Sequence, residues 1–130
     1  MGFRMGTAYT ETALVTELNL ALFTDIGVLP PLNVPIDNAI VFLFWSFEVD
    51  VAAGGNSIEI VLHRGDSTTG VLIQDLALGP WAPGDNRHEA GCTVDRPGVV
   101  AEQIYTLGAA MGGATANSPI ADVRIIALML

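Results

Sequence analysis

The sequence contains few side chains that are suited to binding a metal ion. The available ligands are His63, His88, Glu89, Cys92 and the nearby Asp85. In "DNRHEAGC", His88 and Cys92 stand four residues apart and would share one face of a helix, but Pro83, Gly84 and Gly91 predict a loop here. No Cys-x-x-Cys or His-x-His pair occurs. We therefore predict no metal site and no cofactor.

Nucleophilic and acid–base chemistry find equally little support. The serines lie outside any nucleophile-elbow pattern, and Cys92 is interpreted as a small, partly buried loop thiol. Glu48 and Asp50 are two residues apart, so on a strand they share a face. They are interpreted as the solvated end of that strand rather than as a catalytic pair. We predict no catalytic residue and no enzymatic activity.

An Arg-Gly-Asp tripeptide, Arg64-Gly65-Asp66, lies within "SIEIVLHRGDSTTGVLIQD". Glycines favour turns because they adopt positive φ, and Asp, Ser and Thr side chains bond local backbone groups. The tripeptide is therefore interpreted as a turn between two strands, and not as a cell-attachment signal.

Two residues are candidates for contacts made by loops. Trp81 lies between Pro80 and Pro83, and Arg87 follows in the same region. An aromatic ring with a polar tip suits an interface with a neighbouring subunit or a ligand. Trp45 and Phe47, in contrast, fall on an all-apolar strand face and are predicted to lie in the core.

Period-two alternation dominates the chain and predicts an all-β fold. In "SIEIVLH", Ile58, Ile60 and Leu62 share one face. Short runs of this kind are separated by segments rich in Gly, Pro, Asn and Asp. We predict a single β-sandwich of about eight antiparallel strands. The segment 10–27 fits both a helix (Leu14, Leu18, Leu22) and alternation, and a strand is preferred because the rest of the chain is β.

Two segments, residues 40–44 and 125–130, are apolar on both faces and call for burial against another chain. Charged residues make up only 15% of the chain and hydrophobic residues 51%, whereas about 25% charged is usual. A homo-oligomer explains both features. The predicted interface residues are Ile40, Phe42, Phe44, Tyr105, Ile125, Leu128, Met129 and Leu130.

Charge and run length limit the partners. The net charge is −9, with five basic residues against 14 acidic ones, which argues against direct nucleic-acid binding. The longest apolar run, residues 39–47, is far shorter than the roughly 20 residues of a spanning helix, so no membrane segment is expected. Residues 1–12 are predicted to be an N-terminal arm, and residues 13–130 to form one domain.

The order of strands from about residue 12 resembles a single jelly roll of the small trimeric structural proteins of tailed phages and other viruses, which are similar to the tumour-necrosis-factor fold. The segments that carry the resemblance are "SIEIVLHRGDSTTGVLIQD", "DRPGVVAEQIYTLGA" and "ADVRIIALML". It implies a homotrimer that decorates or cements the outside of a phage-like capsid. The partners would be the major capsid protein or other virion subunits, and the chain would be made in the host cytoplasm.

Other functions fit the same pattern of strands. A small major capsid protein and a head or tail fibre belong to the same structural class. A lectin-like or receptor-binding jelly roll would hold a ligand near Trp81 and Arg87. A cupin-like metalloenzyme is disfavoured because the His-x-His pair is missing.

Overall fold

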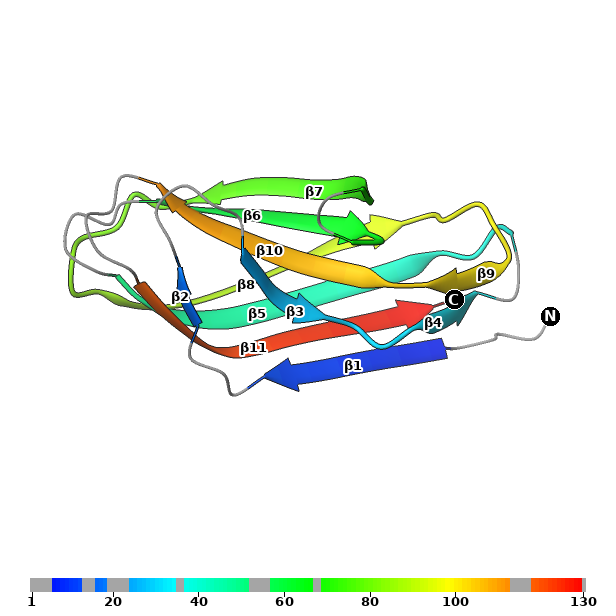
Figure 1. Cartoon of the computed structure of the whole chain (residues 1–130), viewed down its shortest axis with the longest axis horizontal. Helices are drawn as coiled ribbons and strands as arrows, with labels where there is room; N and C mark the ends of the chain where they lie inside the picture. The colour runs from blue at the N-terminus through cyan, green and yellow to red at the C-terminus, as the bar shows by residue number, and fades with distance from the viewer. Residues whose placement is uncertain are drawn as a thin grey trace.

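The chain forms two packed antiparallel sheets, shown in Figure 1. The computed structural model describes residues 6–12, 16–18, 24–34, 37–51, 57–66, 69–112 and 118–129. These residues contain strands and connecting segments and no helix. The prediction of an all-β sandwich is therefore confirmed.

Eleven strands are present in this part of the chain. They are β1 (Gly6–Thr12), β2 (Thr16–Leu18), β3 (Thr24–Val28), β4 (Leu32–Val34), β5 (Val41–Asp50), β6 (Ser57–Arg64), β7 (Val71–Leu78), β8 (Asn86–Asp95), β9 (Ala101–Gln103), β10 (Tyr105–Gly112) and β11 (Ser118–Met129). Sheet 1 has the order β1-β11-β5-β8, with β2 also paired to β11, and sheet 2 has the order β3-β10-β6-β7. The short strands β4 and β9 pair with each other.

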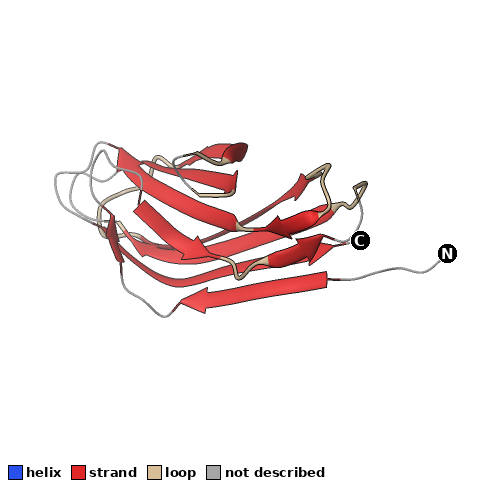
Figure 2. Ribbon diagram, turned by 45° about the vertical axis from the view of Figure 1, so that its right-hand side comes forward, coloured by secondary structure: helices blue, strands red, loops and turns tan. Residues whose placement is uncertain are grey.

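The four-plus-four order of the long strands is that of a jelly roll. Strands that are neighbours in sheet 1, such as β5 and β8, are far apart in sequence, while β6 and β7 form a hairpin in sheet 2. The two views in Figures 1 and 2 show the sheets as two layers. Face-to-face packing of this kind buries one face of each sheet, and the alternation in the sequence supplies the apolar residues for it.

The core lies between the two sheets. In β5 the odd-numbered residues are all buried, and Trp45 and Phe47 stack there with ring centroids 5.7 Å apart. Trp45 Nε1 donates a hydrogen bond to Gln74 Oε1 of β7 (3.0 Å), which satisfies the polar atom of this buried ring. Trp45 and Phe47 are therefore core residues, as the alternation predicts.

Strand β8 corrects one sequence interpretation. The segment "DNRHEAGC" was expected to be a loop because of its glycines and proline, but Asn86–Asp95 pairs with β5 along its whole length. Gly91 is not a turn residue here: a Cβ at this position would lie 2.3 Å from Cζ2 of Trp45. The glycine is needed because the Trp45 ring occupies the space of a side chain.

Strand β1 lies within the segment that is predicted to be an N-terminal arm. Gly6–Thr12 pairs with β11 over seven residues, from Gly6 opposite Met129 to Thr12 opposite Val123. An edge strand needs only a partner with unpaired backbone groups, and β11 provides one. Thr16–Leu18 is also a strand, whereas Leu14 and Leu22 lie outside the described residues. The division into an arm and one domain stays a prediction.

Candidate interaction surface

The outward face of sheet 1 carries apolar side chains where solvent-facing residues are usually polar. The even-numbered residues of β5 point to this face, since its odd-numbered residues are buried. Phe42 lies opposite Leu128 of β11 and Val94 of β8. Phe44 lies opposite Ile126 on one side and Cys92 on the other. Two successive cross-strand rows are therefore apolar.

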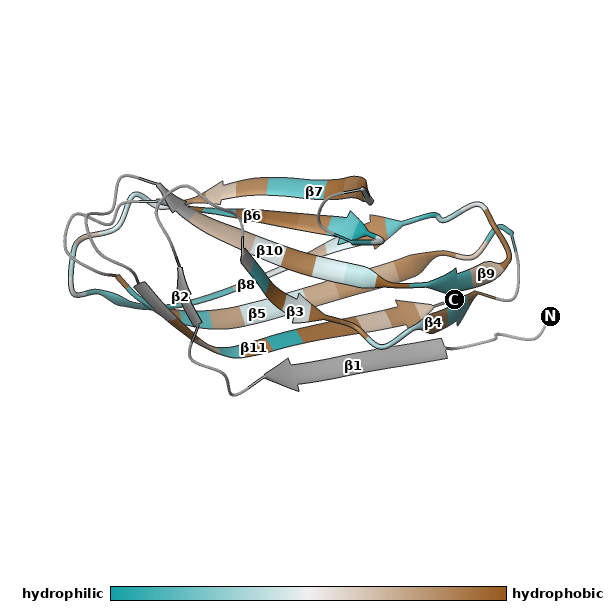
Figure 3. Cartoon of the chain, in the orientation of Figure 1, coloured by the Kyte–Doolittle hydropathy of each residue, from teal (hydrophilic) through white to brown (hydrophobic). Residues whose placement is uncertain are grey.

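We call these outward-facing apolar residues patch 1: Phe42, Phe44, Val94, Ile126 and Leu128. The exposed fractions are 43% for Phe44, 44% for Val94 and 36% for Ile126. In Figure 3 the end of β11 nearest the C-terminus is brown, the colour of apolar residues. A half-exposed side chain of this size would gain about 1 kcal/mol if fully buried. Exposed apolar patches are a feature of interaction surfaces, so patch 1 is the candidate surface of this chain.

The other half of the same face is polar. Asn86 Nδ2 donates hydrogen bonds to Glu48 Oε1 (2.7 Å) and Asp50 Oδ1 (2.6 Å). His88 Nε2 lies 3.8 Å from Glu48 Oε2. These contacts agree with the interpretation of Glu48 and Asp50 as the solvated end of the strand.

An open cleft of about 350 Å³ lies over this polar half. It is lined by Ser46, Phe47, Glu48, His88, Glu89, Ala90, Asp122 and Arg124. Asp122 has a φ of 51° and sits where the pairing of β11 with β5 shifts register. The cleft lies beside this irregularity, where the ladder between β11 and β5 is interrupted. Nothing in the lining forms a nucleophile–base pair, and we assign the cleft no chemistry.

The predicted interface residues divide into two groups. Phe42, Phe44 and Leu128 lie on the outward face and Ile40 is partly exposed, so all four are available to another chain. Tyr105, Ile125 and Met129 are buried in the chain's own core, at 0%, 0% and 3% exposure. Their burial therefore needs no second copy. Leu130 lies outside the described residues.

Val94 and Cys92 also belong to this face and were not predicted, because β8 was not recognised as a strand. The signal was present in the sequence: Ala90, Cys92 and Val94 alternate with Gly91 and Thr93. All three are exposed on the outward face. The thiol of Cys92 thus sits in the second apolar row, beside Phe44.

Trp81 and Arg87 are brought together by the fold. The guanidinium carbon of Arg87 lies 5.7 Å from the centroid of the Trp81 ring, a cation–π geometry. Arg87 also lies near Glu89, with Nε 3.7 Å from Oε1, and Trp81 packs partly against the core. One face of the ring is thus covered by Arg87, which leaves less of it for stacking on a ligand.

The Arg-Gly-Asp segment is a turn whose side chains bond within the chain. Gly65 has a φ of 96°, a conformation that glycine adopts readily. The Asp66 carboxylate accepts hydrogen bonds from the backbone N–H (2.6 Å) and hydroxyl (2.9 Å) of Thr69, and Gly70 N donates to Asp66 O (3.0 Å). These contacts close the turn between β6 and β7.

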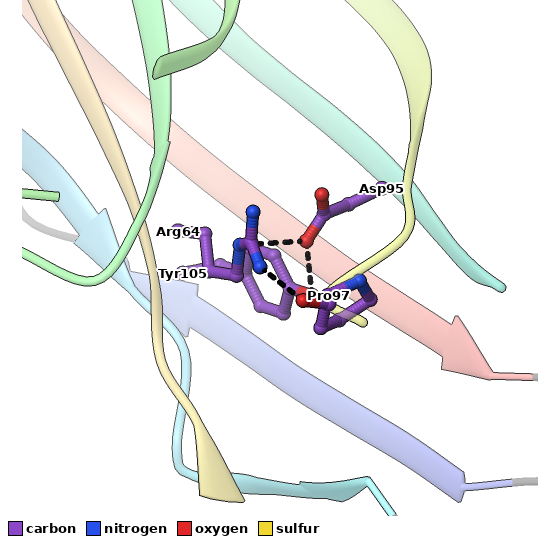
Figure 4. A network of polar contacts seen from close by, with 4 residues as sticks. All are labelled: Arg64, Asp95, Pro97 and Tyr105. Carbon is purple, nitrogen blue, oxygen red and sulfur yellow. Dashed lines mark hydrogen bonds and ion pairs between the residues drawn. The ribbon is translucent and has the colours of Figure 1, made fainter. Parts of the chain in front are cut away.

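Arg64 points into a buried polar network that joins three segments, shown in Figure 4. Its Nε lies 3.2 Å from Asp95 Oδ2, and its Nη1 donates to the carbonyl of Pro97 (2.8 Å). The Tyr105 hydroxyl donates to the same Asp95 oxygen (2.9 Å). Burial raises the pKa of Tyr105 well above its usual value, and the hydrogen bond to Asp95 adds to this shift. The Arg64 guanidinium therefore makes its contacts within the folded chain.

The described residues contain neither a cluster of metal ligands nor a membrane-spanning helix. In this part of the chain no group of three or more His, Cys, Asp or Glu side chains is placed to hold a metal ion. The same residues include no helix of the length and apolar character needed to cross a membrane.

Several solved viral structures share this fold. No protein-family model matches the sequence, and no curated protein matches it. A chain in the structure of the infectious bursal disease virus Gx strain superposes with a TM-score of 0.62 at 7% identity, covering 96% of this chain and 33% of that chain. A chain of the VP2 subviral particle of the same virus gives 0.61 at 7% identity, covering 95% and 33%. The present chain thus spans about a third of those viral chains, and at this identity the likeness shows the fold alone.

Proposed function

We propose that this protein is a non-enzymatic structural subunit of a virion that assembles with copies of itself. The single observation that carries the proposal is patch 1, an exposed apolar surface on an otherwise well-packed jelly roll. The likeness of the fold to chains of a virus particle supports the same assignment. Charged residues make up only 15% of this protein, which suits a chain with much of its surface covered by other subunits.

The finer form of the proposal is a homotrimer that decorates or cements the outside of a phage-like capsid. Its mechanism is burial: patch 1 fixes the oligomer, and the loops and the N-terminal arm, residues 1–12, contact the major capsid protein or other virion subunits. The arm includes β1, an edge strand of sheet 1. The net charge of −9 keeps such a particle exterior soluble.

The proposal is tested by quantitative mass spectrometry of purified virus particles from the source of the sequence. We expect the chain in a fixed copy number per particle that is a multiple of three, and we expect it to rebind particles from which it has been stripped. If the chain is absent from the particles at every stage of assembly and release, a virion role is contradicted.

A further inference from the structure

A second exposed apolar surface lies at one end of the sandwich, around the turn at Gly65. Three segments are held together there. Arg64 pairs with Val71 at the start of β7, and its Nη1 donates to the carbonyl of Pro97 (2.8 Å). Gly65 N donates to the carbonyl of Ile104 (2.6 Å). We call the large aliphatic side chains that these segments leave exposed the end patch: Val71 (55%), Val99 (47%), Val100 (63%) and Ile104 (41%).

The end patch continues the apolar surface of patch 1 around the end of the molecule. Val94 of patch 1 is followed by Asp95, where β8 ends, and then by the loop that leads to β9. This loop turns at Gly98, which has a φ of 71°, and then presents Val99 and Val100. In Figure 3 the loop is brown where it enters β9. Strand β5 begins and β11 ends at the same end of the sandwich (Figure 1).

The opposite end of the sandwich is acidic. Glu48 and Asp50 lie where β5 ends, and Asp85 and Glu89 lie near the start of the adjacent β8. Arg87 offsets one of these four charges. Like charges brought together across an interface are repelled, so two copies that approach through this end are kept apart. Contact between copies is therefore favoured at the apolar end.

Two charges of opposite sign flank the end patch. Arg96 directly precedes Pro97, and Glu102 of β9 stands two residues after Val100. Both side chains are exposed, and within the described part of the chain neither makes an ion pair or a side-chain hydrogen bond. The residue opposite Glu102 in the β4–β9 pair is the uncharged Asn33. Each charge is thus available to the opposite charge of another copy.

We infer that three copies converge at a threefold axis through the end patch, with Arg96 of each copy facing Glu102 of the next. Residues beside a rotation axis meet their own equivalents, so one patch is sufficient to close the ring. The pair of two different side chains then repeats head to tail around the axis. Patch 1 continues the contact away from the axis, and the acidic ends point outward. The inference rests on the proposed self-assembly and specifies its geometry.

The first test reverses the two charges, in Arg96→Glu, Glu102→Arg and the double variant. Circular dichroism checks that each variant folds, and light scattering coupled to size exclusion over a dilution series measures assembly. Each single reversal should weaken every contact roughly tenfold, because attraction becomes repulsion, and the double variant should assemble like the wild type. A general effect of net charge would instead move the two single variants in opposite directions. Glu59→Arg, a reversal on the exposed face of β6, is the matched control and should keep the wild-type mass.

The second test measures proximity to the axis. In a Cys92→Ala background, Val100→Cys places a thiol on the end patch, and Ala77→Cys places one at an exposed position near the acidic end of β7. A short bis-maleimide should link copies of the Val100→Cys chain into covalent dimers, seen on a denaturing gel. The Ala77→Cys chain should remain monomeric on the same gel, because that end points away from the axis.

Other outcomes overturn the inference and leave different parts of the account standing. If the wild type is a trimer but the single reversals do not weaken it, or the double variant is not restored, Arg96 and Glu102 do not face each other. If the Val100→Cys chain is not cross-linked in such a trimer, the end patch lies away from the axis. In both cases self-assembly through patch 1 survives. If the wild type is monomeric at every concentration, the proposed self-assembly fails as well.

Discussion

Two regions of the molecule depart from the usual distribution of polar and apolar residues, and they do so in opposite directions. The Arg64–Asp95–Tyr105 network places charge inside the sandwich, whereas patch 1 places phenylalanine and isoleucine outside it. Buried polar groups and exposed apolar patches are the informative exceptions in a folded chain. The groups of the first interact with one another within the chain, although Arg64 Nε, 3.2 Å from Asp95 Oδ2, makes no hydrogen bond. The second has no partner among the described residues, and we propose that it serves assembly.

The difference implies that the two regions fail in different ways. Changes in the network should lower the free energy of unfolding, and changes in patch 1 should lower the affinity between copies.

Asp95→Ala should destabilise the fold most. It leaves the Arg64 guanidinium without its ion-pair partner and the Tyr105 hydroxyl without its acceptor, in a site where Asp95 is 7% exposed. Loss of one partner from a largely buried pair costs about 3 kcal/mol. Urea denaturation measures this loss, and Asp95→Asn, which keeps an oxygen for Tyr105, should lose less. Equal stability of Asp95→Ala and the wild type would contradict a structural role for the network.

Tyr105→Phe should cost about 1 kcal/mol, because only one hydrogen bond is removed while Asp95 keeps its contact with Arg64. The same denaturation experiment measures it. In a double-mutant cycle with Asp95→Ala the two losses should fall short of additivity, since both variants remove the same hydrogen bond. Strict additivity would show that Tyr105 and Asp95 do not interact.

Phe44→Thr and Ile126→Thr should change the unfolding free energy of the monomer by less than about 0.5 kcal/mol, because both positions are exposed and threonine suits a strand. Their effect should appear in assembly instead. The thermal midpoint of the wild type should rise with chain concentration, and that dependence should disappear in the variants. A midpoint that keeps its concentration dependence would exclude patch 1 from the contact.

Glu59→Gln should give the smallest change. Folding raises the pKa of Glu59, so the native state favours the protonated carboxyl. That contribution is complete below the unfolded pKa and is lost as pH rises through the folded pKa. The variant should therefore be more stable than the wild type by about 0.3 kcal/mol at pH 7 and equal to it near pH 3.5. A gain of the same size at both pH values would rule out relief of charge repulsion.

The sequence was enough to predict the class of fold, because residues of β5 and β6 alternate between the two faces of a strand and so indicate which side chains lie together. It was not enough to say which of two apolar faces points inward. Tyr105, Ile125 and Met129 therefore appeared to be interface residues, although the opposite sheet of the same chain covers them.

Strand β8 and the polar network were missed for a different reason. Gly91 signals a turn when it is considered alone, and only the position of Trp45 on the neighbouring strand shows why it must be small. Arg64, Asp95 and Tyr105 lie in three different strands, and only the tertiary fold brings them together. A local sequence pattern does not predict contacts between residues that lie in different strands.

The most direct test of the account is the native mass of the wild-type chain, measured by light scattering coupled to size exclusion over a range of concentrations. We predict a species of three times the 13.7 kDa chain, or a larger multiple of it, that dissociates on dilution. A monomer at every concentration would mean that patch 1 does not hold copies together, and the proposed assembly would be contradicted.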